Sequence, residues 1–278
     1  MKKIPLSCAD FTFPLLKHED ACRLISMLGV EGVDIGFFTG RSHIRPEQVE
    51  GREAAEGSKL KARLGDLGLT ASDVFLQTGA THDERAANHP DKTQREAGFE
   101  MFRRAVDFAL ACGSSHLTGL PGVSFKGVSD EDSFKLAAEE SSRRAAVAAD
   151  SGLSYSVEAH IGSIAATPVK AQDFVKLSGN VTLTLDYGHF IYAGFSNADI
   201  HPLLDHTGHF HARGAANARL QAPVSENTID FGTVHNRLAT RSYDGWICLE
   251  YVWIDWEGCN RCDNISETTL LRNLFQNL

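Results

Sequence analysis

Short runs of β-branched and aromatic residues recur along the chain, and each is followed by a longer segment with apolar residues at three- and four-residue spacing. Runs of this kind, bounded by glycine or polar residues, are typical of strands. The pattern predicts the strands IPLSC (4–8), GVDIG (32–36), LTASDVFLQ (69–77), SHLTGL (115–120), LSYSVEA (153–159), VTLTLDY (181–187), GHFHA (208–212) and WICLEY (246–251).

The segments between these runs have the spacing of amphipathic helices. The clearest are EDACRLISML (19–28), EAGFEMFRRAVDFALACG (96–113), SFKLAAEESSRRAAVAADSG (133–152) and ETTLLRNLFQNL (267–278). Asp130 and Ser133 are candidate caps of the helix at 133–152, and Pro168 is a typical first residue for the next helix. Glycine follows the predicted helix ends at Gly29, Gly113 and Gly152. The start and stop signals therefore agree with the spacing.

Eight strand–helix units in sequence fit a (β/α)8 TIM barrel, an α/β fold. We expect a single TIM-barrel domain over residues 1–278. An open doubly wound sheet is the alternative. That fold usually has a glycine-rich phosphate loop after its first strand, and the stretch SCADFTFP has none.

Composition and charge narrow the class of protein. The hydrophobic content of 42% is ordinary for a soluble globular protein, and no apolar run approaches the roughly 18–20 residues of a membrane helix. The net charge is −9, whereas DNA-binding proteins usually have a basic surface. The six scattered cysteines suit reduced thiols in a cytoplasm better than a disulfide framework. We therefore expect a cytoplasmic protein that binds neither nucleic acid nor a membrane.

Each of the last four predicted strands ends in a carboxylate or an imidazole. The residues are Glu158 and His160 in SVEAH, Asp186 and His189 in TLDYGH, His209 and His211 in GHFHA, and Glu250 in CLEYVW. The active site of a TIM barrel lies at the C-terminal ends of the strands, so these groups could converge. His209 and His211 share one side of their strand, and His211 is nearer its end and better placed for a site at the rim.

Three carboxylates and one imidazole, from Glu158, Asp186, Glu250 and His211, would make a hard, oxygen-rich metal site. Such a set suits Mn²⁺ or Mg²⁺, with Co²⁺ and Zn²⁺ possible, and we favour Mn²⁺. Without an ion the carboxylates would repel one another, and at least one would stay protonated. The alternative is that each side chain is a rim residue bonded to a neighbouring loop. The occurrence of such groups at four consecutive strand ends favours the metal site.

These motifs resemble those of the sugar isomerase and epimerase superfamily with the xylose-isomerase-like TIM barrel. Its members include ketose 3-epimerases, hydroxypyruvate isomerase, inosose dehydratase and the type IV endonucleases. The order of elements is similar over essentially the whole chain, and VEAH, LDYGH, HFH and LE are the most specific stretches. The resemblance implies that Glu158, Asp186, His211 and Glu250 bind one divalent metal and that His189 helps to hold the substrate.

The chain departs from the superfamily in two places. The ketose epimerases have an arginine in a short NR stretch after the metal histidine, and here Asn217 stands at that place. The nearby arginines are Arg213 and Arg219, and the sequence leaves open which of them faces the site; we select Arg213, with His160, as a substrate-binding candidate. The third and fourth strands lack the extra ligands of the multi-metal endonucleases, which favours a single ion.

The site residues predict a reaction class. Glu158 and Glu250, on opposite sides of a substrate, could remove a proton from one face and return it on the other, which is epimerisation. We therefore predict a divalent-metal-dependent isomerase or epimerase of a small sugar or keto-sugar derivative, acting through a metal-stabilised enediolate. A lyase or dehydratase on a keto sugar is the first alternative, and a DNA-repair endonuclease or a non-catalytic binding barrel ranks lower. Relatives often form dimers or tetramers, so a homo-oligomer is possible.

Several segments near the strand ends have weaker signals. The stretch FFTGRSHIRPE (37–47), which contains Arg41, His43 and Arg45, could bind an anionic substrate group, but a solvated loop before the second helix is the favoured interpretation. The phenylalanines after the first two strands could form a pocket wall, although a cap on the barrel core is favoured. The polar segment at 78–95 could be a lid or an ordinary exposed loop. Trp253 and Trp256 could line the pocket mouth or a subunit contact.

Overall fold

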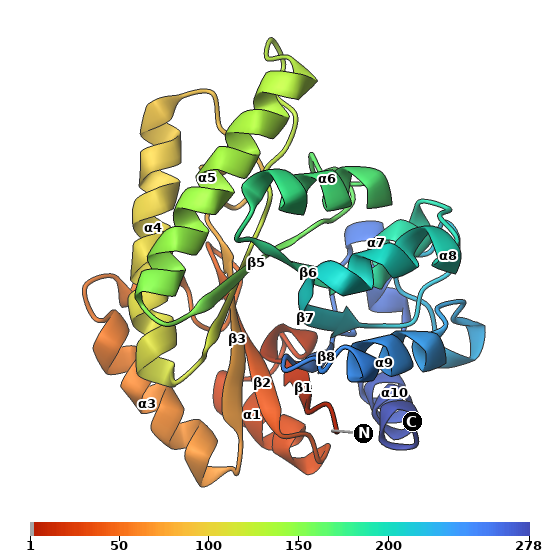
Figure 1. Ribbon diagram of the computed structural model, residues 1–278. Helices are drawn as coiled ribbons and strands as arrows, with labels where there is room; N and C mark the ends of the chain where they lie inside the picture. The colour runs from red at the N-terminus through yellow and green to blue at the C-terminus, as the bar shows by residue number, and fades with distance from the viewer. Residues whose placement is uncertain (1–2) are drawn as a thin grey trace.

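The computed structural model describes residues 3–278 and forms a closed barrel of parallel strands in the order β1 to β8 (Figure 1). The strands are β1 Leu6–Ala9, β2 Gly32–Phe38, β3 Thr70–Gln77, β4 His116–Gly119, β5 Ser154–Glu158, β6 Thr182–Asp186, β7 Thr207–Ala212 and β8 Ile247–Leu249. The barrel closes where β1 pairs with β8, with Ser7 beside Cys248. All eight predicted strands are present, and the predicted (β/α)8 TIM-barrel fold is confirmed.

Helices surround the strands, and the long helices α4 and α5 run along one side of the barrel (Figure 1). The α-helices are α1 His18–Met27, α2 Pro46–Val49, α3 Glu53–Asp66, α4 Lys92–Cys112, α5 Asp130–Asp150, α6 Pro168–Ser178, α7 Tyr187–Tyr192, α8 Asn197–Ile200, α9 Phe231–Thr240 and α10 Asn264–Gln276. Short 3-10 helices lie at Asp10–Thr12, His201–His206, Val224–Glu226 and Trp256–Arg261. Within residues 3–278, no helix combines the length and the apolar character needed to cross a bilayer.

The helix caps follow the sequence signals with one correction. Pro168 is the first residue of α6, as predicted, and Gly113 ends α4 at a φ of +84°, which a residue with a Cβ rarely adopts. The prediction that Asp130 and Ser133 cap α5 is wrong. The cap is Ser129, whose hydroxyl accepts the Asp132 N–H at 3.0 Å, because the helix begins earlier than its apolar spacing suggests.

The apolar core fills the layer between the strands and the helices. Phe37 of β2 stacks on Phe108 of α4 with ring centroids 4.8 Å apart, and Phe102 of α4 meets Tyr155 of β5 at 5.3 Å. All four side chains are buried, and each large side chain removed from water contributes roughly 1.5–3 kcal/mol. This layer holds the strands in position, so that their C-terminal ends form a fixed rim.

The inside of the barrel is polar. Asp34 of β2 accepts hydrogen bonds from Ser7 at 2.7 Å and Ser72 at 2.5 Å, and its other oxygen lies 2.5 Å from Nε2 of His209. Asp34 and His209 are fully buried. A second buried network consists of Asp73, His116 and Ser156. Buried polar groups need partners, so these networks fix which side chains face inward.

Candidate active site

A cavity of about 510 Å³ opens at the C-terminal ends of the strands. Its lining combines an apolar wall with acids, imidazoles and two arginines. The lining includes Phe11, Phe38, Arg41, Phe75, Gln77, His82, Glu158, His160, His189, Arg213, Glu250, Val252 and Trp256. A cavity of this size, with a few polar groups on an apolar wall, is typical of a small-molecule site.

His211 of β7 lies between two glutamates from the neighbouring strands. Its Nδ1 is 2.9 Å from Glu158 Oε1 and 3.3 Å from Glu250 Oε2. Glu158 is the last residue of β5, and Glu250 directly follows β8. One candidate ligand atom from each residue lies within 4.8 Å of the other two, and all three residues are buried. The structure therefore brings together three of the four predicted metal ligands.

Glu158 and Glu250 share one imidazole partner, His211. The pKa of Glu158 is raised to about 7, first by burial and also by the charges of Glu250 and Asp186, against the opposing effect of His211. Glu250 Oε2 is buried and accepts no hydrogen bond from the described residues. A buried carboxylate oxygen without a donor is costly. The set of donors, two buried carboxylates that share one imidazole, fits a divalent cation.

Asp186, the fourth predicted ligand, faces a different partner. It is the last residue of β6 and forms a second buried group with Glu158 and His189, again with ligand atoms within 4.8 Å of one another. One carboxylate oxygen accepts the Gly188 N–H at 2.8 Å, and the other contacts the guanidinium of Arg213. The predicted ligands thus fall into two adjoining groups that share Glu158.

The structure answers which arginine faces the site. Arg213 is buried, and its Nη2 contacts Asp186 and lies 3.3 Å from Nε2 of His189. Burial and the nearby Arg213 charge lower the pKa of His189, so a neutral imidazole faces the guanidinium. Arg219 instead pairs with Glu226, and both side chains are about half exposed. The choice of Arg213 therefore agrees with its placement at the cavity.

His160 also faces the cavity. Its Nδ1 lies 2.8 Å from the Ile161 carbonyl, and its Nε2 is buried without a hydrogen-bond partner in the described part of the chain. Burial lowers the pKa of His160 to about 4, so the ring is neutral. It packs against His82 with centroids 4.4 Å apart. His82 belongs to the polar segment at 78–95, so this segment covers one side of the cavity, as a lid would.

Asp34 is a functional candidate that the sequence reasoning missed. Its Oδ2 lies 2.5 Å from Nε2 of His209 and 3.4 Å from Nε2 of His211. The carboxylate therefore faces both imidazoles of the HFH stretch and leaves Nδ1 of His211 toward the glutamates. An aspartate in the middle of the apolar run GVDIG was the available signal, because a buried acid needs a partner.

The aromatic wall comes from the first strands. Phe11 and Phe38 have ring centroids 5.0 Å apart, and Phe38 meets Phe75 at 5.2 Å. Phe11 and Phe38 thus line the cavity, whereas Phe13 and Phe37 lie in the core, so each interpretation of these phenylalanines holds for half of them. Trp256 also lines the cavity.

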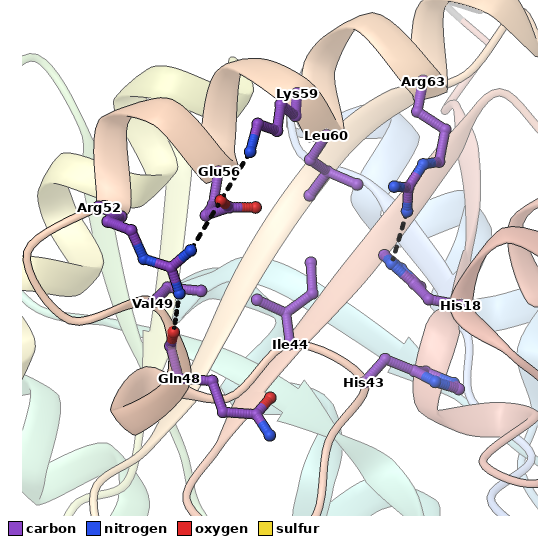
Figure 2. A pocket seen from close by; sticks show the side chains of 10 residues that line it. All are labelled: His18, His43, Ile44, Gln48, Val49, Arg52, Glu56, Lys59, Leu60 and Arg63. Atoms are coloured by element: carbon purple, nitrogen blue, oxygen red, sulfur yellow. Dashed lines mark hydrogen bonds and ion pairs between the residues drawn. The ribbon is translucent and has the colours of Figure 1, made fainter.

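A second hollow, of about 300 Å³, lies against α1, α2 and α3 (Figure 2). Arg52 and Lys59 both reach Glu56, at 3.4 and 2.9 Å, as the dashed lines in Figure 2 show. These basic side chains are about two-thirds exposed, so their charges are screened by water. None of the predicted site residues lines this hollow, and the candidate active site is therefore the cavity at the strand ends.

Comparison with known proteins gives the family. The model of the family described as xylose isomerase-like TIM barrel matches residues 22–269. The chain belongs to this family. Among curated protein sequences, none matches the chain significantly. In this xylose isomerase-like barrel, the family match spans every residue of the acid and histidine groups described above.

Solved structures agree with this barrel over nearly their full length. A D-psicose 3-epimerase, crystallised in the presence of D-fructose, has a TM-score of 0.77 at 15% identity and covers 99% of each chain. A 3-keto-D-glucoside 4-epimerase from E. coli has a TM-score of 0.72 at 16% identity and covers 99% of this chain and 100% of its own. A probable 3-DHS dehydratase from Bacillus anthracis has a TM-score of 0.70 at 13% identity, with 98% and 99% covered. Likeness at such identities establishes the xylose isomerase-like fold.

Proposed function

We propose that the protein is a divalent-metal-dependent epimerase or isomerase of a small sugar or keto-sugar derivative. The observation that supports this most strongly is the buried placement of Glu158 and Glu250 beside His211 at the cavity. The similar structures add support for the reaction class, since two of those described above are sugar epimerases.

Glu158, Asp186, His211 and Glu250 are the residues that would hold the ion, with Mn²⁺ favoured and Mg²⁺, Co²⁺ or Zn²⁺ as alternatives. Their buried oxygens and the undonated Oε2 of Glu250 fit a hard cation. A bound ion would act as a Lewis acid that makes the C–H beside the substrate carbonyl more acidic. For Asp186 to contribute, its carboxylate must be shared with Arg213.

Glu158 and Glu250 are the proposed acid–base pair. Each carboxylate faces the cavity from a different strand, so one can take the proton from the carbon beside the carbonyl while the other faces a different side of the substrate. Return of a proton to the opposite face of that carbon gives the epimer. Return to the former carbonyl carbon gives the isomer, so the same pair accounts for either product.

His189, Arg213 and His160 are the proposed substrate-binding residues. All three line the cavity, and the neutral rings of His189 and His160 can bond to sugar hydroxyls in either direction. Arg213 offers a fixed positive charge next to Asp186. The phenylalanine wall and Trp256 exclude water from the reacting atoms and strengthen these contacts.

The experiment that tests this proposal is proton exchange in D₂O. The Mn²⁺-loaded protein is incubated with a panel of ketopentoses and ketohexoses, and NMR follows deuterium at the carbon beside the carbonyl. We expect incorporation together with new epimer or aldose signals for at least one sugar. A Glu158→Gln variant should give neither, and a protein that exchanges no proton in any sugar would contradict the proposal.

A dehydratase of a keto sugar is the second candidate. It would use the same acids and the same ion, and a dehydratase is among the similar structures. The D₂O experiment separates the two, because a dehydratase would yield a product that has lost the β-hydroxyl. A nucleic-acid substrate is disfavoured by the net charge of −9.

A further inference from the structure

Arg41 lies at the mouth of the cavity in the loop that follows β2. Its guanidinium carbon is 4.6 Å from the centroid of the Phe38 ring, a cation–π distance. Its Nη2 donates to Oε1 of Gln77, the last residue of β3. An aromatic face and a neutral amide thus hold the guanidinium beside the cavity that Glu158 and Glu250 also line.

The charge of Arg41 is not neutralised by the protein. Among residues 3–278, no carboxylate lies within 4.0 Å of it, whereas Arg213, which also lines the cavity, is paired with Asp186. Although its side chain is exposed at the cavity mouth, partial desolvation lowers the pKa of Arg41, while the more distant charges of Glu158 and Glu250 oppose that effect. One contact to Gln77 leaves most of its five N–H donors free.

The other charges of the site would cancel once an ion is present. The three acids of the proposed ligand set are balanced by a divalent ion and the charge of Arg213. The neighbouring His82 does not add charge, because burial and the charge of Arg41 lower its pKa. The guanidinium of Arg41 is therefore the surplus charge at the mouth, and it would favour a ligand that brings one negative group.

We propose that Arg41 binds an oxyanion at the end of the substrate remote from the reacting carbonyl, so that the protein acts on an acidic keto sugar in preference to a neutral one. The inference rests on the proposed function, which it narrows to a substrate class. A carboxylate matches the planar donors of one guanidinium in a two-bond contact, and a phosphate is the other source of the same chemistry. Because Arg41 is exposed at the mouth, the anion would keep part of its hydration.

The test compares a ketohexose with two analogues that differ only at carbon 6, one with a carboxylate and one with a phosphate. Dissociation constants are measured by calorimetry and proton exchange by NMR, with the Mn²⁺-loaded protein. A charge-assisted contact predicts a preference of about 10- to 100-fold for an acidic analogue in both measurements. The analogue with the larger preference identifies the carboxylate or the phosphate as the group that Arg41 accepts.

Three variants assign the preference to this residue. Arg41→Gln should lose it while the neutral ketohexose changes by less than about threefold, and Arg41→Lys should keep part of it, because a lysine retains the charge without the fork of donors. Arg45→Gln is the matched control, since Arg45 lies in the same loop and does not line this cavity. It should behave like the parent protein.

The results separate this inference from the proposed function. Exchange with all three sugars and no dependence on Arg41 would overturn the inference and leave the epimerase proposal intact. Binding of an acidic analogue that depends on Arg41, without exchange in any sugar, would support the anion site and contradict the epimerase proposal. An equal loss for neutral and acidic ligands in Arg41→Gln would also overturn the inference.

Discussion

The two halves of the barrel rim differ in chemistry. Strands β5 and β6 end in acids, His211 is the next-to-last residue of β7, and Glu250 directly follows β8. By contrast, β2 ends in Phe38 and β3 ends in Gln77. Both halves line the same cavity. The half formed by β5 to β8 supplies the proposed reacting groups. The other half supplies an apolar wall and the guanidinium of Arg41 at the mouth. It also supplies Asp34, inside the barrel, which faces the proposed ligand His211.

The largest effect should come from a substitution of Glu158, in the half that supplies the proposed reacting groups. Glu158→Gln keeps the shape of the side chain and removes its charge and its basicity, so kcat/KM for the epimerised sugar should fall by roughly 10²- to 10⁴-fold. Steady-state kinetics by NMR measures the loss. Glu226→Gln, an exposed partner of Arg219, is the control and should retain full activity. Activity within about threefold of the parent in Glu158→Gln would remove Glu158 from the mechanism.

The next largest effect concerns a contact between the two halves of the barrel. Asp34 of β2 faces the imidazoles of His209 and His211, so Asp34→Asn should loosen the proposed metal ligand and weaken Mn²⁺ binding by about 10- to 100-fold. Calorimetric titration of the metal-free protein gives the constants. Asp73→Asn is matched, because Asp73 is equally buried and bonds to His116 instead. Equal losses in the two variants would mean that the effect is general damage to the barrel interior.

Metal binding by the half that contains Glu158 should depend on pH. The pKa of Glu158 in the metal-free protein is raised to about 7, in the first place by burial. A proton and the ion compete for its carboxylate, and the proton is bound below that pKa. Mn²⁺ affinity should therefore fall below pH 7, with a slope that approaches about tenfold for each unit of pH, and binding near pH 6 should release protons. Titrations in buffers of different ionisation enthalpy measure that release of protons. An Mn²⁺ affinity that does not change between about pH 5 and pH 7 would refute the prediction.

The smallest effect should come from a substitution in the phenylalanine wall of the cavity. Phe38 is 2% exposed and contacts Phe11 and Phe75, so Phe38→Leu should lower the free energy of unfolding by about 1–2 kcal/mol and raise KM a few-fold with little change in kcat. Urea denaturation and kinetics measure the two. Phe37→Leu, on the same strand but packed on Phe108, should lose similar stability with KM unchanged. A large loss of kcat in Phe38→Leu would contradict the assignment of the reacting groups to β5–β8 and of the cavity wall to the other half.

The fold and the strand-end groups could be predicted from sequence because they depend on periodicity. Short β-rich runs, each followed by a segment of helical spacing, located the strands and placed Glu158, His211 and Glu250 near one rim, where the structure brings them together. Side chains outside that periodicity escaped prediction. Arg41 lies in a loop, where spacing does not fix direction. Its side chain is exposed, and the sequence did not show that Phe38 and Gln77 hold the guanidinium beside the cavity.

Contacts between strands that are far apart in the sequence could not be predicted either. Asp34 and His209 are far apart in sequence, and only the closed barrel places their side chains 2.5 Å apart. The pairing of Asp186 with Arg213 likewise depends on the depth of each side chain at the rim. A pattern along one strand shows which face a residue takes, but not which residue of another strand it meets.

Metal content shows whether the C-terminal ends of β5 to β8 form a divalent-ion site, as we propose. The protein, His211→Ala and His235→Ala are produced with Mn²⁺, Co²⁺ and Zn²⁺ available and analysed for bound elements; His235 lies on α9, outside the cavity. We expect about one ion per chain in the parent and in His235→Ala, and loss of most of it in His211→Ala. No bound ion in the parent, or equal content in His211→Ala, would contradict it.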